Sequence, residues 1–287
     1  MRPVFVFLCI VSVFTSGAQT LSVNNTGLNS NPAYLLANRM IGGGMNVFNV
    51  SFAGNASQQI GYYTTGTNAI GSASGVAIST GNVQNLALHN VSTSVGGNLG
   101  AINPTDADIL LLANGQTVKD WFILEFDFIP SGDELNVSYV FGSEEYGEYV
   151  CAANADIFAV LVSGSGMVGP YANAAENIAT VPSTSDPAGI NSINDGVVGP
   201  FGVAGGCTNG LPSPYFNANT DTLQEMDGYT NVMTINRTVV CVRTHTICVL
   251  LFSIAVVKIL IQVYFFLKAA FTVTDWEHTI IRLCLIR

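Results

Sequence analysis

The amino-acid sequence predicts an all-β protein, a β-sandwich of the jelly-roll type with one or two short helices. Residues 135–141 alternate strictly, with Leu135, Val137, Tyr139 and Phe141 on one face and Asn136, Ser138 and Val140 on the other. Alternation with a period of two predicts a half-buried strand. Residues 157–162 are almost wholly apolar, which predicts a strand buried on both faces. Residues 19–240 are dense in Gly, Asn, Ser and Thr and carry little helical periodicity, as in turn-rich β proteins.

The chain divides by composition into three parts, of which the first, residues 1–18, is typical of a secretory signal peptide. Arg2 precedes an apolar core at residues 4–14, and small residues at 16–18 occupy the positions that a signal peptidase reads. A transmembrane anchor would need about 18 to 20 apolar residues, and this core is shorter. The sequence therefore predicts export, with a mature chain that begins at Gln19.

The second part, residues 19–240, is expected to form the β domain. Its expected elements are a helix at 31–40, strands at 45–52, 60–63 and 75–79, a helix at 105–113, a buried strand at 118–128, the two central strands, a strand at 178–181, a glycine-rich loop at 182–214 and a strand at 227–235. This part holds 17 Asp and Glu residues but three basic ones, Arg39, Lys119 and Arg237. Nucleic acid is therefore excluded as a partner, because phosphate binding needs clustered Lys and Arg.

The connection between the two central strands, residues 142–156, is acidic and aromatic. Its four carboxylates, Glu144, Glu145, Glu148 and Asp156, form a candidate calcium site, because Ca²⁺ takes several carboxylate and carbonyl oxygens. A solvated acidic turn is the alternative. A glycosidase would need two carboxyls that flank one bond, whereas Glu144 and Glu145 point to opposite faces of an extended chain. The sequence thus assigns no catalytic residue and no cofactor other than this candidate calcium.

The third part, residues 241–287, has a different composition. It contains no Gly, Pro or Asn, and it carries five basic residues against two acidic ones. Residues 247–271 are long and apolar enough to cross a bilayer, and Arg282 and Arg287 beyond them suit a type I orientation after a cleaved signal. Lys258 in the middle of this segment opposes a transmembrane span.

Several motifs in order resemble the choice-of-anchor L domain, a family of bacterial exported or surface proteins. They are YVFGSEEYGEYVC at residues 139–151, NADIF at 154–158, LVSG at 161–164, GVAISTG at 75–81, NIATVP at 177–182, INSIN at 190–194 and DGY at 227–229. The resemblance covers about residues 30–235. It implies a secreted, β-rich module and carries over no catalytic residue.

The family's expected ending, a tyrosine–basic–LAI strand followed by a DSGVF strand, is missing from this chain. Read one nucleotide earlier, however, the codons of residues 245–273 permit TYNMRLAIFDCGGEDIDSGVFLFEGGIYS. One hypothesis is therefore that residues 241–287 are an aberrant hydrophobic tail produced by a frameshift. The alternative is a genuine transmembrane segment at 247–271.

A disulfide between Cys151 and Cys207 is expected. Export places the chain in an oxidising compartment, both cysteines fall in loops beside strands, and the resemblance places a cysteine near each position. Free thiols, or pairing with Cys241, are the alternatives.

The sequence as a whole predicts a secreted or cell-surface, non-enzymatic module for adhesion or ligand binding. Its expected partner is a surface ligand or glycan, with membrane contact only through the tail. The alternatives are an exported polysaccharide hydrolase that uses the acidic connection and a type I membrane protein with its domain outside the cell.

Overall fold

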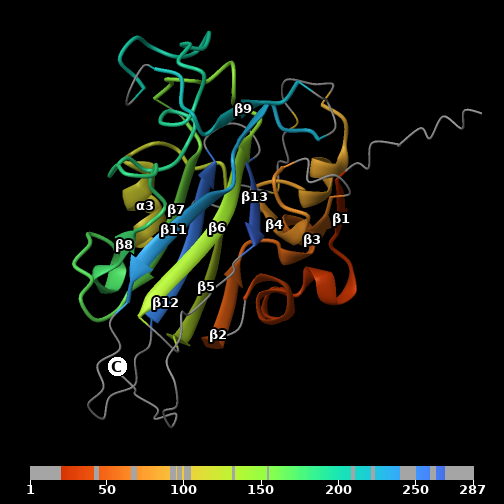
Figure 1. Ribbon diagram of the computed structural model, residues 1–287, viewed down its shortest axis with the longest axis vertical. Coiled ribbons are helices and arrows are strands. Elements are labelled where there is room, and N and C mark those ends of the chain that lie inside the picture. The colour runs from red at the N-terminus through yellow and green to blue at the C-terminus, as the bar shows by residue number, and fades with distance from the viewer. Residues whose placement is uncertain are drawn as a thin grey trace, which may run out of the picture.

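The computed structural model describes residues 21–41, 45–65, 70–90, 95, 99, 105–130, 133–153, 155–207, 211–220, 224–239, 250–258 and 263–268 (Figure 1). The predicted signal peptide at 1–18 lies outside these residues.

Two antiparallel sheets pack face to face, which confirms the predicted all-β sandwich. The first sheet has the strand order β1-β3-β4-β13-β6-β10-β9, and β11 also pairs with β6. Its strands are β1 (Ser22–Asn24), β3 (Ile60–Thr64), β4 (Ser74–Ser79), β6 (Glu134–Ser143), β9 (Phe216–Ala218), β10 (Gly228–Thr230), β11 (Met233–Thr238) and β13 (Val263–Lys268). The second sheet has the order β2-β5-β12-β7-β8. Its strands are β2 (Met45–Ala53), β5 (Asp120–Pro130), β7 (Ile157–Ser163), β8 (Glu176–Asn177) and β12 (Leu250–Lys258).

The core lies between the sheets because the strands alternate as the sequence predicts. On β5 every second residue is buried, and on β6 the predicted inner face is buried from Leu135 to Phe141. Aromatic side chains from both sheets meet there: the ring of Phe158 on β7 lies 5.0 Å from Tyr139 and 6.4 Å from Phe141. This interior fixes β6 and β7, and therefore the position of the connection between them.

Both expected helices are present, together with short helices that were not predicted. The first is α1 (Pro32–Leu35), continued by η2 (Leu36–Met40), and the side chain of Asn31 caps it by accepting from the Tyr34 backbone N–H. The second is α3 (Ala107–Ala113), capped by Asp106. The additional α-helix is α2 (Ala56–Gln59), and the 3₁₀ helices are η1 (Gly27–Ser30), η3 (Val83–Ala87) and η4 (Ala172–Ala174).

Asparagine side chains explain two differences from the expected strands. The strand predicted at 178–181 is absent, and β8 ends at Asn177, whose side-chain oxygen accepts from the backbone N–H groups of Val160 and Ala179. The strand predicted at 227–235 is divided into β10 and β11. At the break, the Asn231 side chain accepts from Asn217 Nδ2 at 2.8 Å and donates to the Pro214 carbonyl at 3.1 Å. The register with β6 shifts by one residue there, from Tyr229 opposite Gly142 to Met233 opposite Tyr139.

The apolar tail supplies an inner strand to each sheet. β12 pairs with both β5 and β7, and β13 pairs with both β4 and β6 (Figure 1). The expected boundary at residue 240 thus falls between β11 and β12, and the described part of 247–271 is extended backbone. Apolar runs rich in Val, Ile and Phe are common to membrane spans and to buried central strands, so composition alone does not separate them. Among the residues that the structure describes, no helix is both long enough and apolar enough to span a bilayer.

Candidate functional site

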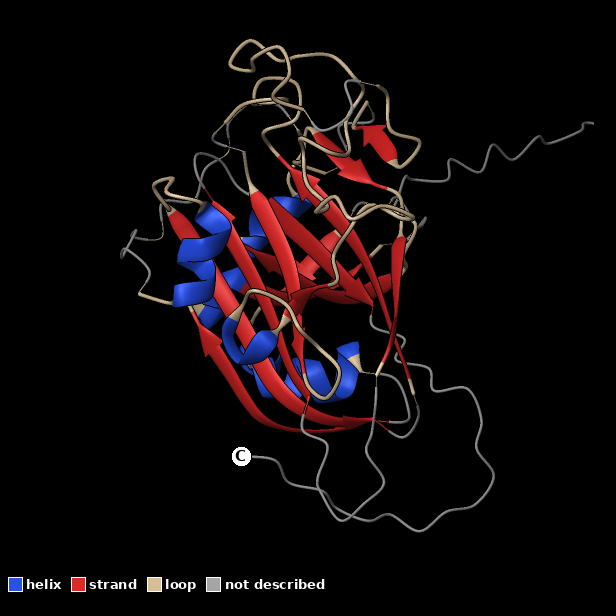
Figure 2. Cartoon of the chain, turned by 90° about the vertical axis from the view of Figure 1, so that its left-hand side faces the viewer, coloured by secondary structure: helices blue, strands red, loops and turns tan. Residues whose placement is uncertain are grey.

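The loops gather at one end of the sandwich and form what we call the loop cap: the connection at residues 144–156 and the long loop at 182–214. Figure 2 shows loops crowded at the top end of the strands, and the teal loops at the top of Figure 1 belong to the long loop. Since β6 and β7 hold the two ends of the connection, the rigid sandwich positions the cap.

Glu145 and Asp156 form the inner acidic pair of the connection, and both are at least 98% buried. Glu145 Oε2 accepts from the Asp156 backbone N–H at 2.9 Å, and Ser143 Oγ donates to Asp156 Oδ2 at 3.0 Å. The Glu145 backbone N–H in turn donates to Ser143 Oγ at 3.0 Å. These bonds join the first residues of the connection to its last, so the inner pair closes the loop.

Glu144, one residue earlier, faces other carboxylates instead. It is fully buried, and neither of its oxygens has a hydrogen bond of normal geometry. Burial raises the pKa of Glu144 to about 9, and the charges of Asp227, Glu225 and Glu148 add to this rise, while the Val95 backbone amide opposes it. Burial likewise raises the pKa of Asp227 to about 6, against the lowering effect of a hydrogen bond from Asn90.

The structure therefore divides the four candidate calcium ligands between two environments. Glu145 and Asp156 bond to each other, whereas Glu144 and Glu148 belong with Asp227 and Glu225. In the part of the chain that the structure describes, no three Asp, Glu, His or Cys side chains gather as a metal-binding group.

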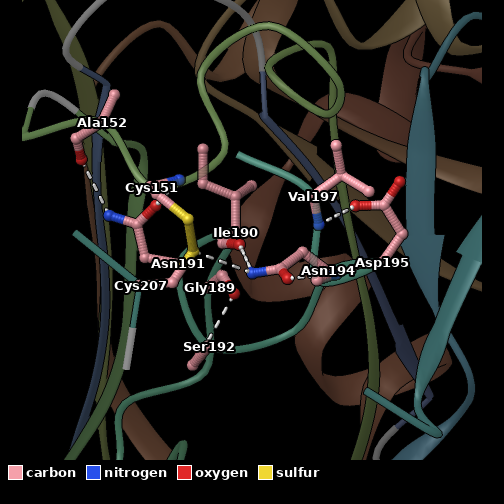
Figure 3. Close-up of a disulfide and its surroundings, with 11 residues drawn as sticks. Cys151, Ala152, Gly189, Ile190, Asn191, Ser192, Asn194, Asp195, Val197 and Cys207 are labelled. Atoms are coloured by element: carbon pink, nitrogen blue, oxygen red, sulfur yellow. Dashed lines mark hydrogen bonds between the residues drawn. A yellow bond between two sulfur atoms is a disulfide. The ribbon is translucent and has the colours of Figure 1, made fainter. Parts of the chain in front are cut away.

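The structure pairs Cys151 with Cys207, the pairing that the sequence analysis favours. The Cα atoms lie 4.4 Å apart and the bridge closes a separation of 56 residues. Figure 3 shows two asparagines beside it. Asn191 accepts from the Cys151 backbone N–H and donates to the Ala152 carbonyl, both at 2.8 Å, and Asn194 donates to the Ile190 carbonyl at 2.7 Å. The disulfide and these amides fasten the long loop to the end of the connection.

Backbone hydrogen bonds run along the same seam. The N–H groups of Gly199, Phe201 and Val203 donate to the carbonyls of Val150, Glu148 and Cys151 at 3.0 to 3.1 Å. Glycine permits this close approach: a Cβ atom on Gly199 would lie 2.3 Å from the Glu148 carbonyl oxygen. The long loop is thus attached to the connection from residue 199 to residue 207.

The attached loop exposes apolar side chains. Their exposed fractions are 63% for Val197, 44% for Val198, 61% for Phe201, 59% for Val203 and 72% for Leu211; we call these five residues the apolar loop surface. Phe201 stacks on Tyr149 with ring centroids 4.8 Å apart. The backbone of Leu211 runs beside Gly196, next to Val197, since a Cβ on Gly196 would lie 2.9 Å from the Leu211 carbonyl carbon. Such neighbouring exposed apolar side chains are typical of interaction sites.

Sequence reasoning placed the disulfide but missed two features of the cap. It passed over residues 197–211 as a glycine-rich loop, although Val, Phe and Leu recur among the glycines. It also did not connect Glu144 with Asp227, because the two are 83 positions apart and meet only through the pairing of β6 with β10. The DGY motif at 227–229 was the available signal, since an acidic residue stands there at the start of a strand.

Comparison with known proteins identifies a family. The model of the choice-of-anchor L domain matches residues 22–255, most of the chain, and its match extends beyond residue 240 into β12. No curated protein and no solved structure matches the chain.

Proposed function

We propose that this chain, which belongs to the choice-of-anchor L family, is a non-enzymatic module that binds a protein partner through its apolar loop surface. The family consists of exported or surface-anchored modules, so the partner is to be sought outside the cell. Binding at a surface would make the module an adhesion domain.

The single observation that carries this proposal is the exposed apolar side chains on a loop that is held in place. Phe201 and Val203 are more than half exposed, yet the backbone N–H of each is bonded to the connection and the disulfide follows at Cys207. A loop fixed before binding loses little conformational entropy when it binds, which favours affinity. Loops are also where rigid scaffolds carry binding residues.

The chemistry of the surface favours a protein over a glycan as the partner. Four of its five side chains are aliphatic, and they pack well against aliphatic and aromatic side chains. The half-buried Glu148 and the exposed Asp195 lie at its border, and the whole chain carries a net charge of −10. We therefore expect a partner with an apolar patch bordered by Lys and Arg.

The burial of the carboxylates supports a non-enzymatic role. A polysaccharide hydrolase needs two carboxyls that reach the same glycosidic bond from either side. Glu144, Glu145 and Asp156 are at most 2% exposed, and Glu145 is bonded to the Asp156 backbone. A substrate would have to displace this structure to reach them.

The test is a binding screen of the full chain against a panel of purified extracellular proteins and a glycan array, followed by variants. For a protein ligand found in the screen, Phe201→Ser combined with Val203→Ser is expected to weaken binding at least tenfold. Val168→Ser is the matched control, because Val168 is 86% exposed and lies outside the apolar loop surface. Since surface variants rarely change the free energy of unfolding by more than about 0.5 kcal/mol, all three proteins should melt alike.

Raising the salt concentration should weaken binding further, because charged groups at the rim of an interface are screened. Binding of glycans alone, or protein binding that the combined Phe201→Ser and Val203→Ser variant leaves intact, would contradict the proposal. Release of reducing sugar from a polysaccharide panel, lost in Glu145→Gln, would favour the hydrolase instead.

A further inference from the structure

The second unusual feature of the cap is a row of buried oxygens across three strands. Gly228 on β10 pairs with Ser143 on β6 and with Ala218 on β9. One residue beyond these pairs, the same register places Asp227 opposite Glu144 on one side and opposite Asn219 on the other. The Asn219 backbone N–H donates to the Asp227 carbonyl at 3.1 Å, so this ladder does continue. Directly opposed residues of antiparallel strands have their side chains on the same face, with Cβ atoms about 5 Å apart.

Each side chain in this row leaves an oxygen without a donor. Asn219 Nδ2 donates to the carbonyls of Gln224 and Met226, which leaves its Oδ1 buried and unpartnered. Asp227 Oδ1 accepts from Asn90 at 2.9 Å, but Oδ2 accepts nothing. Neither oxygen of the fully buried Glu144 has a hydrogen bond of normal geometry, and the Val95 backbone amide offsets only part of the rise in its pKa.

Two neighbours extend the same pattern. Glu225, two residues before Asp227, is 1% exposed, and its Oε1 has no partner. The side-chain oxygen of Gln224 is buried in the same way. All of these unpartnered atoms are acceptors, and like charges placed directly opposite each other destabilise a sheet.

Two of the basic side chains that the structure describes are engaged away from this row, and a third, Lys119, is exposed. The Arg39 guanidinium lies 4.3 Å from the centre of the Tyr62 ring, and Arg237 pairs with Glu176. The row therefore combines buried negative charge with acceptor oxygens and one side-chain donor, Asn90.

We propose that Glu144, Asp227 and Asn219 form a calcium site, with Glu225 adding negative charge beside it. Carboxylate and side-chain amide oxygens are the ligands that Ca²⁺ takes, six to eight in number and with water completing the shell. This mixed shell does not require three gathered carboxylates. It also differs from the set predicted from sequence, because Glu145 and Asp156 lie in the other cluster.

The site has a consequence for the cap, since Glu144 begins the connection that carries the apolar loop surface. A cation that joins β6, β10 and β9 at this point would hold the base of the connection as the disulfide holds its end. The metal site does not depend on the proposed partner, and the two are tested separately.

The experiment is calcium titration of the full chain after chelator treatment, by calorimetry and by thermal melting at pH 7.5. Extracellular calcium modules bind with dissociation constants of about 10⁻⁴ to 10⁻³ M. In 10 mM CaCl₂ the melting temperature should therefore rise by about 5 °C. MgCl₂ should give a smaller shift, because Mg²⁺ keeps its water and demands octahedral geometry.

Variants locate the site. Glu144→Gln should weaken calcium binding at least tenfold. It should also raise the melting temperature of the metal-free protein, because it removes a buried carboxyl that the folded state must either charge or protonate. Glu134→Gln is the matched control, as Glu134 lies on the same strand but is exposed. If Glu144→Gln does not fold, Asp227→Asn and the wild-type isotherm decide the question. The proposal is overturned if wild type gives neither binding heat nor a melting shift in 10 mM calcium, or if Glu144→Gln binds as tightly as Glu134→Gln.

Discussion

The sandwich and the loop cap are held together by different means. Between the sheets, apolar and aromatic side chains such as Phe126 and Phe158 are fully buried, and strand ladders satisfy the backbone. The cap has little regular structure. Its segments are held by backbone hydrogen bonds between loops, amide side chains, a disulfide and buried carboxylates.

The comparison shows why the two regions respond differently to change. The sandwich depends on many weak contacts, so it tolerates single surface substitutions but not the loss of a strand. The cap depends on a few specific groups, so single residues matter there. Its carboxylates also differ among themselves: Glu145 has hydrogen-bonded surroundings, whereas Glu144, its neighbour, faces other acids.

Removal of the tail should have the largest effect, because it breaks the sandwich itself. A chain ended after residue 240 lacks β12 and β13, so β5 and β7 lose their common neighbour, as do β4 and β6. We expect no cooperative melting by circular dichroism, together with binding of an apolar dye to the exposed edges. A chain ended after residue 268 keeps both strands and serves as the control. Cooperative melting of the shorter chain would mean that residues 19–240 suffice for the fold.

Resequencing of codons 230–287 tests whether the apolar sequence of β12 and β13 is the genuine ending of the protein. In the alternative reading frame, LAI falls at residues 250–252, the start of β12, and GVF falls at 263–265, the start of β13. If that frame is open, we expect the protein encoded by it to melt at a higher temperature than the present chain. Stops in that frame would instead make the apolar strands the genuine ending.

Removal of the disulfide should have the next largest effect on stability, and this effect arises within the cap. Replacement of both Cys151 and Cys207 by serine removes a link across 56 residues. A loop of this length corresponds to about 4 kcal/mol of lost stability in the chain-entropy treatment. Urea unfolding of the double variant, compared with wild type under oxidising conditions, measures this loss. A change below about 1 kcal/mol would mean that the hydrogen-bonded seam holds the loop without the bridge.

Disruption of the inner acidic pair should have a smaller effect on stability than loss of the disulfide. Glu145→Ala leaves the buried Asp156 backbone N–H without its acceptor and should destabilise the protein by about 3 kcal/mol. Glu134→Ala, an exposed change on β6, should stay within about 0.5 kcal/mol of wild type. Equal losses in the two variants would show that the hydrogen bonds within the cap contribute nothing specific.

The sandwich could largely be predicted from the sequence because its signals are local. Alternation along residues 135–141 and the apolar run at 157–162 correspond to β6 and β7, and the helices at 31–40 and 105–113 lie where capping residues place them. The strand expected at 178–181 is absent because the Asn177 side chain accepts hydrogen bonds from backbone N–H groups in place of a strand partner. The strands β12 and β13 were not predicted because an apolar tail of this composition suits a membrane as well as a sheet.

The candidate sites could be predicted only in part, because they depend on contacts between distant positions. Cys151 and Cys207 could be paired because both fall in loops beside strands of a chain expected to be exported, and the resemblance places a cysteine near each. No local pattern shows that Glu144 lies opposite Asp227, since that follows from the register of β6 with β10. Equally, no pattern shows that Val203 stays exposed, because its exposure depends on the seam with residues 148–151.

The last expected effect is a pH dependence of the calcium-free protein, which separates the two kinds of carboxylate. Burial raises the pKa of Glu144 to about 9 and that of Asp227 to about 6, and the charges of Glu225 and Glu148 face Glu144 as well. A raised pKa means that the folded state holds these protons more tightly than the unfolded state. Stability from this source is complete below the ordinary carboxyl pKa and is lost as the pH rises toward 6 for Asp227 and 9 for Glu144.

In chelator, the free energy of unfolding should therefore fall between pH 5 and pH 9, by at most about 1.4 kcal/mol per pH unit for each group. Urea unfolding at several pH values measures the slope. Glu144→Gln should flatten it above pH 6, where Asp227 has already lost its proton, whereas Glu134→Gln should leave it unchanged. A wild-type slope of zero over this range would mean that these buried oxygens are satisfied without a proton, and the distinction between Glu144 and Glu145 would then fail.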